Sequence, residues 1–267
     1  MIINNLFNVK NKVVLITGGS RGIGEMIATG FIANGSKVYI SSRKEKDCIE
    51  TAKRLSNEYD NKVTAIPADI SDIDGINSLF NEYKKHETAL DVLINNAGAV
   101  WSEPFENFSE LGWDKVMDLN VKSIFFMIQK FLSMLKKNCN TENQSRIINI
   151  GSIDGINTPF YENYSYSVAK SAVHKLTSVM AAKLIKENII CNAIAPGPFP
   201  SKMLGTALDH DYTTVSKKNP SGRVGRAEDI AGLAIFLASN AGQFTVGETI
   251  TCDGGLVASA GHDLTNE

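Results

Sequence analysis

The feature that most constrains the fold of this chain is an apolar run that passes directly into a glycine-rich turn and then a helical pattern. Residues Lys12 to Thr17 are mostly apolar and β-branched, which predicts a strand buried on both faces. Gly18 to Gly24 supply the turn, and the helical pattern continues to about Asn34. A strand, a tight turn and a helix in this order predict the opening unit of a parallel α/β sheet.

The same alternation continues to the end of the chain, without an internal repeat. Further strands are predicted at residues 37–41, 62–66, 90–94, 146–150, 189–195 and 248–252, and helices at 44–57, 73–86, 111–137, 164–187 and 228–239. A chain of 267 residues suits one large domain. We therefore predict an α/β fold: a single-domain, doubly wound Rossmann fold over residues 1–267, with a seven-stranded parallel sheet and helices on both faces. Residues 198–225 contain three prolines and no clean period, which predicts a substrate-side loop with room for a short helix.

Unusual residues gather where the predicted strands end. In a doubly wound sheet, ligands bind at the carboxyl ends of the strands, near the switch in strand order. The residues at these ends are the turn glycines, Arg43, Asp69, Asn95 to Gly98, Ser152, and Pro196-Gly197. Their recurrence favours a functional edge of the sheet.

The glycine turn can bring the backbone close to a pyrophosphate at a helix N-terminus. Its spacing, Gly18-x3-Gly22-x-Gly24, differs from the common GxGxxG fingerprint. A tight strand-helix turn with no ligand is the alternative explanation of these glycines.

Tyr166 and Lys170 are four residues apart in a helix-compatible run, so both side chains lie on one helical face. A phenol has an ordinary pKa of about 10, and a fixed ammonium group nearby lowers that pKa by favouring the phenolate. Such a pair can exchange a proton with a carbonyl or alcohol oxygen. The alternative is a chance Tyr/Lys pair on a solvated helix face.

Composition excludes several other classes of function. The formal net charge of -2 gives no general attraction to nucleic acid or to an anionic membrane. The four cysteines and four histidines show no metal-ligand spacing, and no apolar run reaches membrane-spanning length. We expect a cytoplasmic protein with no metal site, and with neither nucleic acid nor membrane as a partner.

Taken together, the motifs resemble those of the short-chain dehydrogenase/reductase family. The resemblance extends from about Asn8 to Gly255, and its motifs are Thr17 to Gly24, Asn95 to Gly98, Asn120, Ser152, Tyr166-x3-Lys170 and Pro196-Gly197. Within the family the chain is most similar to NADPH-dependent 3-oxoacyl reductases, including the rhamnolipid-pathway type. The closer match is carried by residues 146–152, 195–197 and 222–226.

The resemblance implies a catalytic set and a cofactor site. The catalytic set is Asn120, Ser152, Tyr166 and Lys170. Tyr166 would donate a proton to the substrate oxygen, and Ser152 would orient the substrate. Lys170 would lower the pKa of Tyr166 and hold the nicotinamide ribose. Asn120 would hold a water. The cofactor-binding residues would be Gly18, Ser20, Arg21, Gly22, Ile23, Gly24, Ser42, Arg43, Asp69, Ile70, Asn96, Ala97, Gly98, Tyr166, Lys170, Pro196 and Gly197.

Structural roles remain open for several of these residues. Ser152 could cap the end of its strand, Asn120 could be a buried hydrogen-bonding residue, and Asp69 could cap the following helix.

The end of the second predicted strand favours NADP(H) over NAD(H). An NAD site usually has an acidic residue there, whereas this chain has Ser42 and Arg43. Arg43 offers a planar fork suited to the ribose phosphate, and Arg21 in the glycine turn would face the same ribose. Alternatively Arg43 is a solvated residue at the start of a helix that also carries Glu45 and Asp47.

The leading functional hypothesis is NADPH-dependent reduction of a small-molecule carbonyl compound, a 3-oxoacyl thioester or similar ketone. The alternatives are a dehydrogenase of another alcohol, sugar or steroid, and a cofactor-binding regulator without turnover. The resemblance implies that reductases acting on acyl carrier protein have arginines at the positions that correspond to Asn138-Cys139 and Glu187 of this chain. Because these positions are neutral and acidic here, the sequence does not support a basic docking surface for an acidic carrier protein. The expected substrate-side residues are Trp101, Ile153, Phe160, Tyr161, Phe199 and Leu204.

The resemblance also implies a homotetramer or homodimer. Its interface would use apolar residues of the helices around Asn120 and Tyr166. Those residues are Phe125, Phe126, Phe131, Val173, Leu176 and Met180.

Overall fold

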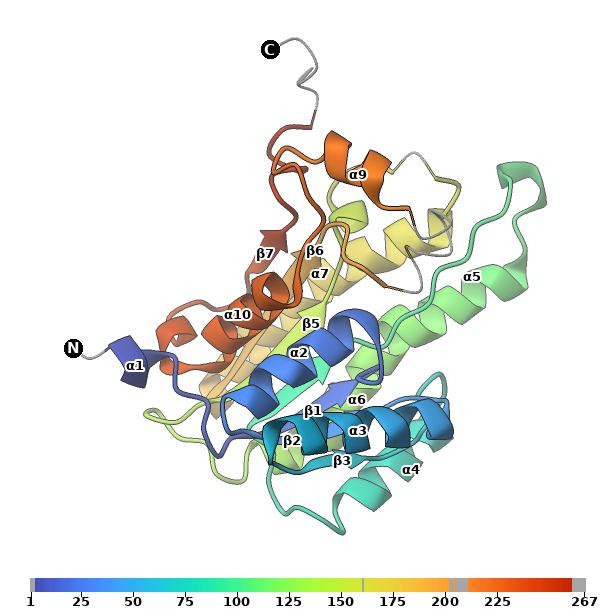
Figure 1. Ribbon diagram of the computed structural model, residues 1–267. Coiled ribbons are helices and arrows are strands. Elements are labelled where there is room, and N and C mark those ends of the chain that lie inside the picture. The colour runs from blue at the N-terminus through green and yellow to red at the C-terminus, as the bar shows by residue number, and fades with distance from the viewer. Residues whose placement is uncertain (1–2, 160, 202–203, 205–210, 261–267) are drawn as a thin grey trace.

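The computed structural model describes residues 3–159, 161–201, 204 and 211–260. Within these residues, seven parallel strands form one sheet in the order β3-β2-β1-β4-β5-β6-β7 (Figure 1). The strands are β1 (Val13–Thr17), β2 (Lys37–Ser41), β3 (Val63–Ala65), β4 (Val92–Asn95), β5 (Ser145–Ile150), β6 (Ile189–Pro196) and β7 (Thr249–Cys252). The predicted doubly wound parallel sheet is confirmed, and its order reverses between β1 and β4.

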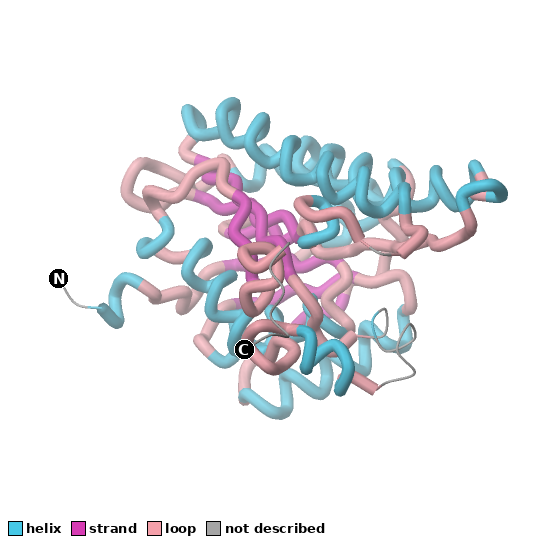
Figure 2. The backbone as a smooth tube through the Cα atoms, turned by 90° about the horizontal axis from the view of Figure 1, so that it is seen from above, coloured by secondary structure: helices cyan, strands magenta, loops and turns pink. Residues whose placement is uncertain are grey.

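Helices cover both faces of the sheet, as Figure 2 shows from above. One face packs against α2 (Gly22–Ala33), α3 (Glu45–Tyr59) and α10 (Ala227–Ala238), and the other against α4 (Ile73–Tyr83), α6 (Ser123–Leu135) and α7 (Tyr164–Leu184). The two cores are separate because successive strand side chains point to opposite faces. In β1, Val14 and Ile16 belong to one core and Leu15 to the other.

Short polar side chains fix where several helices begin. The Asp72 carboxylate accepts a hydrogen bond from the Gly75 N–H at 2.8 Å, so Asp72 caps α4. Asp69 does not cap this helix; its carboxylate instead accepts the Ser71 N–H at 3.1 Å. The alternative of Asp69 as the helix cap was therefore wrong.

The predicted continuous helix over residues 111–137 is interrupted. It consists of α5 (Glu110–Met117), a five-residue π-helix η2 (Asp118–Lys122) and α6. The Asn120 side-chain amide donates to the Val116 carbonyl at 2.8 Å. The backbone N–H of Asn120 would normally use this carbonyl, and such competition widens a helix turn. The break therefore depends on one side chain, which periodicity does not reveal.

Two of the residues expected at an intersubunit interface lie inside the protomer. Phe131 of α6 and Val173 of α7 are fully buried in the core between these helices and the sheet. Phe126, Leu176 and Met180 pack partly against the same core, while Phe125 is exposed. Most of this set therefore covers the protomer's own sheet.

None of the helices in the described part of the chain combines the length and apolar character needed to cross a bilayer.

Candidate active site

The candidate site lies at the carboxyl ends of the strands, around the switch between β1 and β4. Its first component is the turn from β1 into α2. Gly18 and Gly22 have φ of 65° and 55°, values that favour glycine. A side chain at Gly24 would collide with the Gly18 carbonyl and the Asn96 amide. Glycine at these positions thus lets the turn pack closely on itself and on the Asn96 segment.

The start of α2 is suited to an anion. Within the described residues, the N-cap residue Arg21 makes no side-chain capping hydrogen bond, so its side chain does not occupy the N–H groups of the first turn. Ser20 is buried, with its carbonyl accepting from the Thr51 hydroxyl at 2.9 Å, and Ile23 packs against the core. The predicted residues Gly18 to Gly24 therefore form a cradle compatible with a pyrophosphate.

Asn96 joins the cradle to the end of β4. Its side-chain amide donates to the Thr17 and Gly18 carbonyls at 2.9 and 3.1 Å. The Thr17 hydroxyl in turn accepts the N–H groups of Asn96 and Ala97 at 3.0 and 3.1 Å. Asn96 and Ala97 are thus brought together with the glycine turn, as predicted for cofactor-site residues.

The end of β2 carries exposed charges. The Arg43 guanidinium lies 4.0 Å from the Asp69 carboxylate, and the Arg21 guanidinium lies 4.0 Å from that of Asp47. The arginine side chains are 60% and 51% exposed, so both contacts are loose. Ile70 is buried beside them, and the Ser42 hydroxyl donates to the Lys44 carbonyl at 3.5 Å.

Ser152 follows β5 and is oriented by its own backbone. Its hydroxyl oxygen accepts the Asp154 N–H at 3.1 Å, and the hydroxyl lies close enough to Tyr166 to oppose the rise in the pKa of that phenol. Because the backbone uses only an acceptor position, the hydroxyl hydrogen can point toward Tyr166 or toward a substrate oxygen. Ser152 therefore has the strand-end turn role considered from the sequence, and its hydroxyl also faces Tyr166.

Tyr166 and Lys170 occupy consecutive turns of α7. The Lys170 ammonium donates to the Ile150 carbonyl at 2.8 Å and lies 5.4 Å from the centre of the Tyr166 ring. Burial lowers the pKa of Lys170 to about 8. Burial, together with the nearby Asp154 carboxylate, raises the pKa of Tyr166 to about 12. The predicted lowering of the Tyr166 pKa by Lys170 was therefore wrong for the protein alone, because burial and the Asp154 charge raise this pKa.

Asn120 is placed beside this pair by the π-helix. Its amide donates to the Val116 and Ala99 carbonyls, both at 2.8 Å. Its carbonyl oxygen is buried with no hydrogen-bond partner among the described residues. A side chain at Gly98 would lie 2.7 Å from that oxygen and 3.7 Å from the Lys170 ammonium. An unpaired acceptor next to Lys170 fits the predicted water-holding role.

A series of buried side-chain hydrogen bonds connects the strands beneath the catalytic residues to α7. The Asn95 amide donates to the Asn149 carbonyl oxygen, and the Asn149 amide donates to the Thr177 hydroxyl, each at 2.9 Å. These bonds connect β4, β5 and α7, so the strand ends and the Tyr166 helix are held in register.

His174 is a site residue that the sequence reasoning missed. A side chain at Gly151 would collide with the His174 imidazole, whose Nε2 accepts the Ser152 N–H at 3.5 Å. Burial and nearby Lys170 lower the pKa of His174, which keeps this acceptor neutral. The glycine that stands before Ser152, in place of a serine common in the family, is thus explained by the imidazole; a histidine one turn beyond Lys170 was the available signal.

Pro196 ends β6 and Gly197 turns the chain away. The Gly197 N–H donates to the Cys252 carbonyl at 3.0 Å, and a side chain there would lie 2.8 Å from the Asp253 backbone. The two residues lie at the same edge of the sheet as the other predicted site residues.

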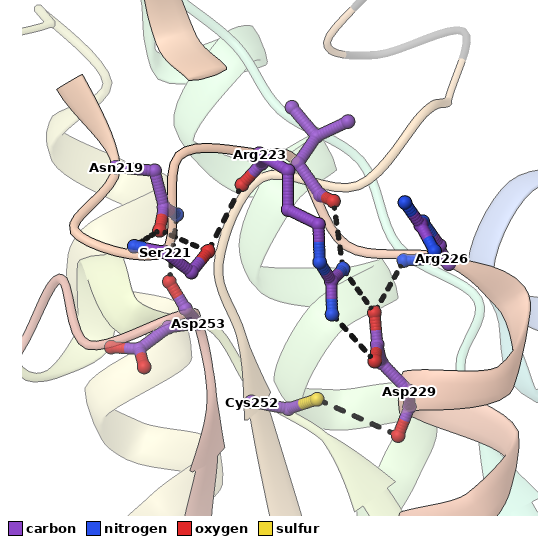
Figure 3. Close-up of polar contacts among 8 residues, drawn as sticks. Asn219, Ser221, Arg223, Arg226, Asp229, Cys252 and Asp253 are labelled. Atoms are coloured by element: carbon purple, nitrogen blue, oxygen red, sulfur yellow. Dashed lines mark hydrogen bonds and ion pairs between the residues drawn. The ribbon is translucent and has the colours of Figure 1, made fainter. Parts of the chain in front are cut away.

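The hydrogen bonds and ion pairs in Figure 3 hold the last part of the 198–225 loop in place. Arg223 makes two hydrogen bonds, of 2.6 and 3.0 Å, to the Asp229 carboxylate, which also accepts the Arg226 N–H at 2.7 Å. The Asn219 amide donates to the Asp253 carbonyl at 2.9 Å. The described part of this loop contains α9 (Thr213–Lys218) and is anchored to the sheet at its end.

The expected substrate-side residues have different surroundings. Tyr161 is exposed, and Ile153 lies in the 3₁₀ turn η3 (Ile153–Gly155) beside Ser152. Trp101 packs on Gly112, with the Lys115 ammonium 4.6 Å from its ring centre. Phe199 is 3% exposed and packs in the core, and it also lines a cavity together with Pro198 and Gly225.

Leu204 donates its N–H to the Ser201 hydroxyl at 3.2 Å, and Phe160 lies outside the described residues.

At the surface around Cys139 and Glu187, where the carrier-protein arginines are absent, the acidic charge is paired with a lysine. Glu187 pairs with Lys136 at 2.8 Å, and the Cys139 thiol donates to the Glu187 carbonyl at 3.2 Å. Within the described ranges, no three His, Cys, Asp or Glu residues form a metal-binding group.

A doubly wound sheet with a glycine cradle and a Ser-Tyr-Lys-Asn group defines a class of oxidoreductase. A family model described as "Enoyl-(Acyl carrier protein) reductase" matches residues 18–257. The chain belongs to the short-chain dehydrogenase/reductase family.

Its relatives include enzymes with different substrates. The chain is 42% identical over 256 residues to the rhamnolipids biosynthesis 3-oxoacyl-(acyl-carrier-protein) reductase of Pseudomonas aeruginosa, covering 94% of this chain and 98% of that protein. It is 36% identical to a 2-dehydro-3-deoxy-D-gluconate 5-dehydrogenase of Dickeya dadantii, covering 96% and 100%. Among solved structures, the Pseudomonas aeruginosa RhlG/NADP active-site complex has a TM-score of 0.90 and 41% identity, covering 95% of this chain and 99% of that one.

Proposed function

We propose that this protein reduces a ketone to an alcohol with NADPH, and that its substrate is a 3-oxoacyl thioester or a ketone of similar shape. The observation that carries the proposal is the grouping of Ser152, Tyr166 and Lys170 at the strand ends beside the glycine cradle. When bound, the reduced nicotinamide supplies a hydride to the carbonyl carbon. The chain itself must then supply one proton to the carbonyl oxygen.

Tyr166 is the proton donor in this proposal. With a pKa raised to about 12, its phenol stays protonated at neutral pH and can donate as negative charge develops on the substrate oxygen. The Ser152 hydroxyl donates a hydrogen bond to the same oxygen and orients it. The alcohol forms as the phenolic O–H bond breaks, and Tyr166 is left as a phenolate.

Lys170 and Asn120 restore the proton. The buried Lys170 ammonium stabilises the phenolate, and the unpaired Asn120 carbonyl oxygen can hold a water that links Lys170 to solvent. The pKa of Lys170, lowered to about 8, suits a group that gives up and regains a proton near neutral pH.

The remaining proposed site residues hold the cofactor. The cradle from Gly18 to Gly24 and the Asn96 to Gly98 segment receive the pyrophosphate and the adjoining ribose. Ser42, Arg43 and Arg21 favour the additional phosphate of NADPH, with Asp69 and Ile70 beside the adenine. Pro196 and Gly197 lie along the nicotinamide. The NADP complex of the similar RhlG structure supports this choice.

The substrate is proposed from the 3-oxoacyl reductase relative. Dehydrogenation or reduction of a sugar or other alcohol is the second candidate, supported by the gluconate-type relative. A steroid substrate and a regulator without turnover remain weaker alternatives, and the complete catalytic group argues against the regulator. The pairing of Glu187 with Lys136 argues against a basic dock for an acidic carrier protein at this surface.

We further propose a cytoplasmic homotetramer or homodimer in which residues 1–267 act as one unit and residues 198–225 border the substrate. Exposed apolar residues on α6 and α7 support the assembly: Phe125 is 38%, Val168 48% and Val179 49% exposed. Light scattering should give at least twice the protomer mass at micromolar concentration. The mass of a single protomer would refute the assembly.

NADPH oxidation with acetoacetyl-CoA and a panel of small diketones tests the reaction. We expect turnover with acetoacetyl-CoA. Turnover confined to sugar acids would favour the second candidate. NADPH binding without turnover on any member of the panel would support the regulator.

A further inference from the structure

Asp154 is an acidic residue beside the catalytic group, and none of the roles assigned above uses its side chain. It lies two residues after Ser152 in η3, and its N–H orients the Ser152 hydroxyl. The turn η3 packs tightly on α7, because a side chain at Gly155 would lie 2.6 Å from the Lys170 backbone carbonyl carbon. Asp154 is therefore held between the substrate-orienting serine and the Tyr166 helix.

The position of the Asp154 carboxylate is fixed by a short hydrogen-bond chain. One carboxylate oxygen accepts the Asn163 amide at 3.2 Å, and the Asn163 carbonyl oxygen accepts the Ser167 hydroxyl at 3.1 Å. Asn163 is 5% exposed, so this support is shielded from solvent. Among the described side chains, Asn163 is the one that hydrogen-bonds the carboxylate, and it leaves the second oxygen available.

The charge of Asp154 acts on the reacting groups. It raises the pKa of both Tyr166 and Lys170, while Lys170 and Asn163 oppose the rise that burial imposes on the pKa of Asp154 itself. The geometry agrees with these effects, because Asp154 donates its N–H to the Ser152 hydroxyl at 3.1 Å and η3 packs on α7 at Lys170. A substrate whose carbonyl oxygen binds at Ser152 would therefore have its neighbouring groups close to this acid.

We propose that Asp154 determines substrate choice: its carboxylate accepts a hydrogen bond from a hydroxyl or ammonium group next to the ketone, and repels a ketone that carries a free carboxylate or phosphate there. This inference rests on the proposed reduction. A half-buried charge is weakly screened, so a like charge is disfavoured more strongly than at an exposed site. A 3-oxoacyl thioester, whose carboxyl group is masked and neutral, is compatible with the site, whereas the free 3-oxo acid is not.

The test compares kcat/KM within two matched pairs of ketones. Acetoacetate and ethyl acetoacetate differ in the carboxylate charge, and 1-hydroxy-2-butanone and 3-pentanone differ in a hydroxyl that replaces a methyl group. The variants are Asp154→Asn, which removes the charge but keeps an acceptor, and Asp154→Leu, which removes both. Asp74→Asn, on the exposed surface of α4, is the matched control. The ratio within a pair is insensitive to loss of folded enzyme.

The wild type should favour the ester over acetoacetate, and the hydroxyketone over 3-pentanone, by about tenfold or more in each pair. Asp154→Asn should abolish the first preference and retain part of the second, Asp154→Leu should abolish both, and Asp74→Asn should change neither. Unchanged ratios in both Asp154 variants, with turnover intact, would overturn this inference alone. Absence of turnover with all four ketones and with acetoacetyl-CoA, in wild-type enzyme that binds NADPH, would instead overturn the proposed function, and this inference with it.

Discussion

The two sides of the candidate site are built in opposite ways. On the catalytic side, Ser152 and Lys170 are 8% and 4% exposed, and each makes a hydrogen bond to neighbouring structure. On the side expected to meet the cofactor phosphate, Arg21 and Arg43 are more than half exposed and contact acids at 4.0 Å. The groups proposed for the reaction are thus held by burial, whereas those proposed for cofactor choice are solvated side chains.

The difference follows from the electrostatic cost of each arrangement. Buried polar groups need partners, and removing one leaves the other unsatisfied, which costs about 1–3 kcal/mol. Exposed ion pairs contribute about 0–1 kcal/mol because water competes for them. Substitutions on the catalytic side should therefore cause a large loss of activity, and those on the phosphate side should cause smaller changes in cofactor preference.

The largest expected effect is at Tyr166. Tyr166→Phe removes the proton donor and keeps the ring, so kcat should fall by about 10²–10⁴-fold while NADPH affinity, measured by fluorescence titration, changes little. Tyr164→Phe is the matched control, since Tyr164 precedes it on the same helix and is 37% exposed. Retention of most activity by Tyr166→Phe would contradict the catalytic assignment.

The pH dependence of the reduction should follow Lys170. Burial lowers the pKa of this lysine to about 8, so its ammonium is present below that pH and lost above it. Tyr166 keeps its proton up to about pH 12 and does not mask this change. As Lys170 deprotonates, kcat/KM should fall by up to about tenfold per pH unit, because the forming phenolate loses its counter-charge.

Lys170→Arg, which keeps a positive charge, should move the fall in kcat/KM to higher pH. A profile that remains flat as the pH rises well past 8 would show that the charge of Lys170 is not needed. The buried lysine would then be a structural residue, and the contrast between the two sides of the site would weaken.

The sequence predicts the framework better than the details of the catalytic side. Strands such as residues 146–150 are recognisable because a buried parallel strand is continuously apolar. The π-helix at Asn120 was missed because it depends on one amide taking the Val116 carbonyl. The raised pKa of Tyr166 was missed because desolvation and Asp154 depend on packing that residue spacing does not specify. The role predicted for Arg43 and Arg21, in contrast, rests on their positions after the second strand and in the glycine turn, and it stays a prediction.

A smaller effect is expected where Gly151 and His174 meet. Gly151→Ala places a methyl group against the imidazole, and overpacking of this kind costs roughly 1–3 kcal/mol. Displacement of the adjacent Ser152 should also lower kcat by about tenfold or more. Thermal melting and kcat measure the two effects.

His174→Ala in the same chain should restore part of both properties by removing the obstacle. Gly232→Ala is the matched control, because no atom of the described residues lies within 4 Å of a side chain at that position. Equal melting temperatures and equal rates for the Gly151 and Gly232 variants would show that the imidazole does not shape this turn.

The smallest expected effect is at Arg43, and it tests the exposed side of the comparison directly. Arg43→Asp replaces the proposed phosphate partner with a repelling charge, so the ratio of kcat/KM for NADPH to that for NADH should fall by about tenfold. A larger fall is not expected, since Arg43 is 60% exposed and solvent screens the interaction. Lys46→Asp reverses the same charge three positions later, at a side chain that is 84% exposed. If the two variants change the ratio equally, the preference arises from the general field around α3 rather than from the guanidinium fork. If Arg43→Asp alone removes the preference for NADPH, then the exposed Arg43 side chain is sufficient to select the cofactor. In the protein alone this guanidinium has only a loose contact, 4.0 Å from Asp69. The phosphate of NADPH would then supply the close partner.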